Sequence, residues 1–212
     1  MFGTHDLWLF VFSGFLLSIT PGPDTLYIVG RSSTQGWGAG AVAALGIGAG
    51  TLVHTCAAAL GLSAILAASA TAFTVVKFIG AAYLLYVGIS LIRSAGASRS
   101  LPGTLVVRPA SMRSIFVQGF LTNVLNPKVA LFFLAFLPQF VAVDAGSKPL
   151  AFLVLGVIFN FNGTLWNLFV AWSTARLSSR LAPGVTFKRW FNRCVGSLFV
   201  FIGLRLALAH EH

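Results

Sequence analysis

The stretch Thr20-Pro21-Gly22-Pro23-Asp24 places helix-breaking residues and a carboxylate inside an apolar part of the chain. Proline lacks a backbone N–H, so two prolines and a glycine stop a helix from completing its hydrogen bonds. In lipid, such backbone groups are tolerated only where protein or water covers them. The pattern predicts a broken helix beside a cavity, in which Asp24 binds a solute or a proton. The plainer interpretation is a kink with Asp24 as the cap of the following helix.

A second break is predicted where Asn126, Pro127 and Lys128 follow one another in another apolar run. A lysine at the centre of a membrane helix costs about 2.5–3.5 kcal/mol on insertion scales. Lys128 therefore needs water, a partner or an anionic group, or else it snorkels to the membrane surface for structural reasons. Of the four acids, only Asp24 lies in an apolar span, so Asp24 is the only candidate if Lys128 needs a carboxylate partner inside the membrane.

Polar side chains also occur on two later helices. His54 lies in the apolar run after the first break, and here a structural role is the favoured interpretation. The run after residue 149 carries Asn160, Asn162, Thr164 and Asn167, which either line a cavity or join helices by hydrogen bonds. The predicted substrate- or proton-binding residues are Pro21, Gly22, Pro23, Asp24, His54, Asn126, Pro127, Lys128 and Asn160. No catalytic residue, metal ligand or cofactor is predicted.

Composition indicates an integral membrane protein. The chain has 212 residues, of which 57% are hydrophobic and 8% charged, whereas soluble domains are about a quarter charged. No Asp, Glu, Lys or Arg occurs between Arg31 and Lys77, and a membrane helix needs ~20 apolar residues. The net charge of +10 does not indicate a nucleic-acid partner, because the basic residues lie between apolar runs. Cys56 and Cys194 fall inside predicted spans and are interpreted as small packing residues.

The apolar runs predict an all-α protein with six transmembrane helices, the first and fourth of them broken. Their predicted bounds are 7–29, 38–69, 73–92, 114–141, 149–175 and 190–208. We treat residues 1–212 as one transporter domain, with a first repeat at 1–92, a cytoplasmic linker at 93–113 and a second repeat at 114–212. Ten of the fourteen Lys and Arg residues, Arg31 among them, fall in the loops after helices one, three and five. This bias predicts that these loops are cytoplasmic and that both termini lie outside.

The two halves resemble each other. Gly14-Phe15-Leu16 precedes Pro21, and Gly119-Phe120-Leu121 precedes Pro127 at a similar distance. Because each half has an odd number of predicted helices, the second half would enter the membrane upside down. Inverted repeats of this kind, with broken helices, are typical of secondary transporters.

These motifs resemble those of the LysE-type amino-acid exporters, and most closely the homoserine/threonine-efflux branch. The resemblance rests on the segments 18–24, 126–128 and 77–88 and covers nearly the whole chain. It implies proton-linked antiport of amino acids or related small metabolites, out of the cytoplasm, by a multi-pass protein of the bacterial inner membrane. The residues carried over are Pro21, Gly22, Pro23, Asp24, Asn126, Pro127 and Lys128. The implied partners are an amino acid, protons and the lipid bilayer, and a homo-oligomer is left open.

Three other functions compete with this interpretation. A thiol-redox electron carrier on the same fold would have a cysteine beside each broken-helix proline, and neither Cys56 nor Cys194 is so placed. A heavy-metal cation exporter would use several carboxylates or thiolates. An enzyme would need a nucleophile with a base or a metal cluster, so no enzyme is predicted. The first two stay as alternatives to amino-acid export.

Overall fold

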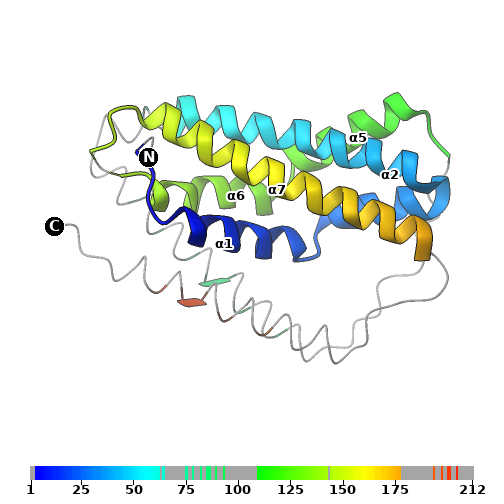
Figure 1. Cartoon of the computed structure of the whole chain (residues 1–212), viewed down its shortest axis with the longest axis horizontal. Helices are drawn as coiled ribbons and strands as arrows, with labels where there is room; N and C mark the ends of the chain where they lie inside the picture. Colours follow the sequence, from blue (N-terminus) through cyan, green and yellow to red (C-terminus); the bar gives the residue numbers. More distant parts are fainter. Residues whose placement is uncertain are drawn as a thin grey trace.

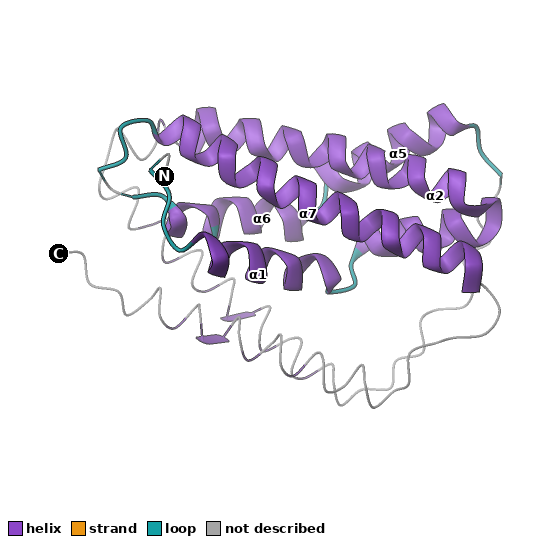
Figure 2. Ribbon diagram, in the orientation of Figure 1, coloured by secondary structure: helices purple, strands orange, loops and turns teal. Residues whose placement is uncertain are grey.

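The computed structural model describes residues 3–62, 109–142 and 144–177, with isolated helical positions between 64 and 93 and between 193 and 204. Within these residues the chain is helical and contains no strand, apart from one isolated bridge between Thr4 and Val141. The helices lie side by side along the long axis of the molecule (Figures 1 and 2).

The first predicted helix is broken where the prolines are. Helix α1 spans Leu7–Ile19 and ends at Thr20, whose N–H bonds back to the carbonyls of Leu16 and Leu17. Gly22 is extended, with φ −151° and ψ −172°, and α2 (Pro23–Ala57) begins at the next residue. The predicted break is therefore confirmed.

Helix α2 reverses direction at Gly36. The φ of Gly36 is +79°, a value that glycine adopts without the steric cost that a side chain brings. A methyl group on Gly40 would overlap the side chain of Ser32, so the chain doubles back between them (Figure 1). The first part of α2, 23–35, completes the first predicted span. The second part continues into the π-helix η1 (Ala58–Leu62) and matches most of the second predicted helix.

The fourth predicted helix is also broken. Helix α5 spans Met112–Val124 and α6 spans Pro127–Ala135, followed by the short 3₁₀ helix η2 (Leu137–Phe140). The two parts of this helix are bent by 48° relative to each other. Lys128 therefore lies in the first turn of α6 and not in the middle of a continuous helix. Helix α7 (Lys148–Leu177) is a single long helix, as predicted for 149–175.

The two broken helices run antiparallel to each other. Lys128, at the start of α6, bonds to the end of α1, and Phe140, past the end of α6, accepts from the N–H of His5 before α1. The first part of α2 also runs antiparallel to α5. Asp24 bonds to Asn123 at the two breaks, and Gln35 bonds to Ala110 at the far end of both helices. This arrangement agrees with an inverted repeat. The predicted helices 73–92 and 190–208 lie almost wholly outside the described residues, so the six-helix repeat stays a prediction.

Two described helices, Pro23–Leu62 and Lys148–Arg176, are long and apolar enough to cross a membrane. A third span results if α5 and the segment Lys128–Phe140 are counted as one broken helix. Leu7–Ile19 is a shorter apolar helix. The chain is thus an all-helical membrane protein.

Phenylalanines fill the end of the bundle at which α1 begins. Phe10, Phe132 and Phe136 are almost fully buried. The ring of Phe132 stacks on Phe136 with centroids 4.8 Å apart, and on Phe159 of α7 at 4.6 Å. These contacts join α1, α6 and α7 on one side of the helix breaks.

The opposite end of the bundle carries a polar cluster. Gln35 Nε2 donates to the carbonyl of Ala110 at 2.9 Å, and Arg31 Nη2 donates to Gln118 Oε1 at 2.7 Å. Arg31 is only 6% exposed, so the prediction that it lies in a loop is wrong. Its guanidinium is buried because Gln118 and Tyr27 supply neutral acceptors. The turn of α2, the start of α5 and the end of α7 lie at this end (Figure 1).

The interpretation of Cys56 as a packing residue is also wrong, because its side chain is exposed on the outer face of α2. Cys194 lies outside the described residues.

Candidate substrate-binding site

The break after α1 leaves two backbone carbonyls without their helical donors four residues on, although Leu17 O still accepts from the N–H of Thr20 at 3.2 Å. In a continuous helix, Leu17 O would accept from residue 21, but Pro21 has no N–H. Thr20 O loses its donor because the chain is extended at Gly22. Lys128 Nζ donates to both oxygens, at 2.8 Å to Leu17 and 2.7 Å to Thr20. The lysine thus supplies the donors that the proline and the extended residue remove.

The break after α5 is satisfied in a similar way. Asn123 O would accept from residue 127, but Pro127 has no N–H. His54 Nε2 lies 3.1 Å from this oxygen and donates to it, since a carbonyl can only accept. The ring of His54 also packs against Phe133, with centroids 5.7 Å apart. These contacts fit the structural role that the sequence context of His54 favours, and a part for His54 in transport stays a prediction.

Asp24 lies where the two breaks meet. Its Oδ2 accepts from Asn123 Nδ2 at 2.8 Å, while its Oδ1 is buried and has no hydrogen bond within the distance limit among the residues that the structure describes. The predicted cap is wrong, because Gly22 holds the capping position of α2 and no side chain caps it. The predicted ion pair is also absent among the described residues, where Lys128 Nζ bonds to Leu17 O and Thr20 O. These hydrogen bonds of Asp24 Oδ2 and Lys128 Nζ are thus to uncharged groups.

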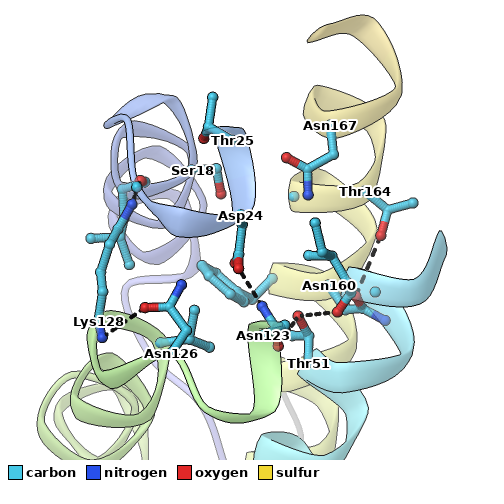
Figure 3. Close-up of a pocket in the computed structure, with 17 residues that line it drawn as sticks. Ser18, Asp24, Thr25, Thr51, Asn123, Asn126, Lys128, Asn160, Thr164 and Asn167 are labelled. Carbon is cyan, nitrogen blue, oxygen red and sulfur yellow. Dashed lines mark hydrogen bonds between the residues drawn. The ribbon is translucent and has the colours of Figure 1, made fainter. Parts of the chain in front are cut away.

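A cavity opens beside these groups, between the two breaks, the second part of α2 and α7 (Figure 3). The empty volume of this cavity is about 500 Å³, and this figure includes space that is open to solvent. The polar lining side chains are Ser18, Asp24, Thr25, Thr51, Asn123, Asn126, Lys128, Asn160, Thr164 and Asn167. Leu17, Ile47, Val129 and Phe159 supply apolar walls.

The predicted residues divide into two groups. The cavity brings together Gly22, Asp24, Asn126, Lys128 and Asn160. Asn126 has a second function, because its Oδ1 accepts from the N–H of Lys128 at 3.0 Å and caps α6.

Three other predicted residues, Pro21, Pro23 and His54, are not among those that line the cavity. Pro21 and Pro23 are exposed, and His54 contacts the backbone oxygen of Asn123. The backbone of Pro127 begins α6. These residues shape the backbone around the cavity.

The sequence prediction missed Asn123 and Thr51 as members of the site. Asn123 is 1% exposed and connects Asp24 with Thr51, whose hydroxyl lies 3.3 Å from Asn123 Oδ1. The signal for Asn123 was present, because it stands four residues before Pro127 in the same motif. Thr51 has no such signal, since threonine is common in membrane helices.

Helix α7 presents a polar face to the cavity. Asn160, Thr164 and Asn167 are spaced by four and three residues, so they lie on one face of the helix. Thr164 Oγ1 and Asn160 Oδ1 are 3.4 Å apart. Of the two sequence interpretations, the cavity lining is therefore observed for these three residues. Asn162 does not line the cavity.

The chemistry of the lining suits a small solute with a positive group. Among the residues that the structure describes, no three His, Cys, Asp or Glu side chains are grouped as a metal site would require. Of the described side chains that line the cavity, Asp24 carries the one anionic group, and amide and hydroxyl groups surround it. Broken helices around a polar cavity are typical of secondary transporters.

Comparison with known proteins agrees with this class. The family model for the LysE type translocator matches residues 15–210. The chain belongs to this family of transporters, which is consistent with a non-enzymatic function.

Curated relatives match over nearly the whole chain. An uncharacterized membrane protein of Pseudomonas aeruginosa is 33% identical, over 98% of this chain and 97% of its own. The leucine efflux protein of Enterobacter sp. strain 638 is 28% identical, over 99% and 98%. An uncharacterized membrane protein of Bacillus subtilis is 28% identical, over 97% and 100%. No solved structure gives a significant match.

Proposed function

We propose that this chain is a proton-coupled antiporter that exports amino acids or related small metabolites across the bacterial inner membrane. The observation that carries the proposal is the buried Oδ1 of Asp24, which has no hydrogen-bond partner in the described part of the chain and lies beside a polar cavity where the two broken helices cross. The family match supports export of this kind of solute, and the named relatives include leucine efflux proteins.

Asp24 Oδ1 is the proposed site of exchange. A buried acceptor without a partner is costly, so this oxygen binds a positive group or a proton. It binds either the ammonium group of the substrate or a proton, but not both together. Release of one therefore accompanies binding of the other, which is the requirement for antiport.

The carboxylate group of an amino acid would meet uncharged hydrogen-bond donors. The amide groups of Asn160 and Asn167 and the hydroxyl of Thr164 line the α7 side of the cavity and suit a carboxylate. The N-terminal end of α2, at Asp24 and Thr25, adds a partial positive charge. Leu17, Ile47 and Phe159 then accommodate an apolar side chain.

The test is counterflow in liposomes with a panel of amino acids and an imposed pH gradient. The wild-type protein should exchange at least one neutral amino acid and move protons in the opposite direction. Asp24→Asn keeps the volume of the side chain but removes its titration, so it should abolish proton-driven accumulation while some passive exchange remains. Unchanged coupling of the two fluxes in Asp24→Asn would refute the role of Asp24. No flux across a broad panel with folded protein would refute amino-acid export.

A further inference from the structure

The end of α1 has the geometry of a cation site. The carbonyl oxygens of Leu17 and Thr20 converge on one nitrogen, Lys128 Nζ, at 2.8 and 2.7 Å. Both oxygens lack the donor four residues on because of Pro21 and the extended Gly22, although Leu17 O keeps a bond from the N–H of Thr20. The C-terminal end of a helix also carries a partial negative charge. In secondary transporters, unwound carbonyls and half-helix C-terminal ends of this kind coordinate the coupling ion.

The side chain of Lys128 reaches this position along the break itself. Its Cδ and Nζ would both lie 3.6 Å from a methyl group placed on Gly22, so the stem passes the residue of the break that has no side chain. Its backbone is fixed by the cap of Asn126 on α6. The lysine therefore connects the start of one broken helix with the end of the other.

We propose that the C-terminal end of α1 is a monovalent-cation site that the protein fills with the ammonium group of its own Lys128. Because this cation is covalently tethered, its effective concentration exceeds that of ions in solution. Transport then requires no added alkali cation, and Lys128 contacts neither the substrate carboxylate nor the Asp24 carboxylate directly. The consequence for transport rests on the proposed function, whereas the cation site itself does not.

The test removes the tethered cation and offers a small one in its place. Purified Lys128→Ala should have a lower Tm than the wild-type protein, because Leu17 O and Thr20 O each lose a donated hydrogen bond. Ethylammonium chloride should raise the Tm of Lys128→Ala saturably, by about 2–4 °C or more. It should leave the wild type and Lys148→Ala unchanged, since Lys148 lies at the start of α7, away from the cavity. Choline chloride, which has no N–H donor, is the matched salt control.

The outcomes are distinguishable. A shift with ethylammonium confined to Lys128→Ala supports the proposal, and an additional shift with sodium chloride shows that the site also takes alkali ions. The same shift with choline or in the wild type, or no shift at all, overturns the proposal. If Lys128→Ala does not fold, Lys128→Met keeps the stem, and ammonium chloride becomes the probe.

A separate transport experiment uses the wild-type protein alone. Replacing all sodium and potassium with choline should leave amino-acid exchange unchanged, and a loss of exchange would overturn the proposal. The Tm measurement does not depend on flux. An ethylammonium shift without any amino-acid flux would therefore refute the proposed function but not the cation site.

Discussion

At the scale of single residues, each break depends on a proline and on a distant donor that replaces its missing N–H. Pro21 leaves Leu17 O open to Lys128 beside the N–H of Thr20, and Pro127 leaves Asn123 O open to His54 beside the N–H of Asn126. Each donor comes from another helix, so each break also joins parts of the bundle. A break of this kind can persist in lipid because its backbone groups keep partners.

His54 provides a test of this role. His54→Ala should lower the free energy of unfolding by about 0.5–1.5 kcal/mol, because Asn123 O loses one hydrogen bond but keeps that from the N–H of Asn126. His54→Gln should recover much of this loss, since its side-chain amide also donates. Thermal unfolding in detergent measures the stability, and proton flux in liposomes measures the coupling. If His54→Gln is stable but uncoupled, His54 carries the proton and the structural assignment is wrong.

Pro21 and Lys128 should be energetically coupled. Pro21→Ala provides an N–H that can satisfy Leu17 O within α1, so loss of the lysine should then matter less. We expect Lys128→Ala to be less destabilising in the Pro21→Ala background, with an interaction energy of about 0.5–3 kcal/mol. A double-mutant cycle on unfolding free energies measures this quantity. Strict additivity would show that the proline does not create the acceptor that Lys128 uses.

At the scale of elements, glycines set the distance between crossing helices. A methyl group on Gly119 of α5 would lie 2.7 Å from the carbonyl oxygen of Ala43 in α2, whereas one on Gly14 of α1 would lie 3.1 Å from Phe159 of α7. Gly14 and Gly119 are the matching residues of the two sequence repeats. Each of these two glycines therefore lies where a broken helix closely crosses a long helix. This is expected if the two halves of the chain are structural repeats.

Gly119→Ala should destabilise the protein by about 1–3 kcal/mol, because the contact with α2 is through backbone atoms that cannot move aside alone. Gly38→Ala is the matched control, since no atom lies within 4 Å of the added methyl group. In a helix this second change should be neutral or stabilising by up to about 1 kcal/mol. The Tm values of the two purified variants decide the comparison. Equal values would contradict the close crossing of α2 and α5.

At the scale of the whole molecule, the ends of the bundle differ in character. One end is closed by stacked phenylalanines such as Phe132 and Phe159, and the other holds the buried Arg31 cluster. Three described arginines, Arg31, Arg113 and Arg176, belong to the second end, whereas Lys148 lies at the first. The positive-inside rule therefore predicts that the second end is cytoplasmic.

Cysteine labelling in intact cells tests this orientation. A cysteine at exposed Gly146, beside the start of α7, should react with an impermeant reagent from outside. A cysteine at exposed Ser111, before α5, should react only after the membrane is permeabilised. The background should lack Cys56 and Cys194. Labelling of position 111 in intact cells would reverse the predicted topology.

Much of this architecture could be predicted from local sequence. Apolar runs require helices in lipid, and a proline interrupts a helix whatever surrounds it, so the local pattern suffices to place both breaks and α7. The same logic made Asp24 and Lys128 candidates, because a charge in an apolar run needs an explanation.

The partners of these groups could not be predicted, because they depend on contacts between distant segments. Sequence suggested an Asp24–Lys128 pair on charge alone, yet each group found uncharged partners that the breaks had exposed: Asn123 for Asp24, and the carbonyls of Leu17 and Thr20 for Lys128. Burial of Arg31 likewise depends on Gln118, which is remote in sequence. The sequence determined where the helices break and which charges must be accommodated. Only the tertiary structure decided which donor meets which acceptor, because a hydrogen bond depends on distances of a few tenths of an ångström that local propensity does not encode.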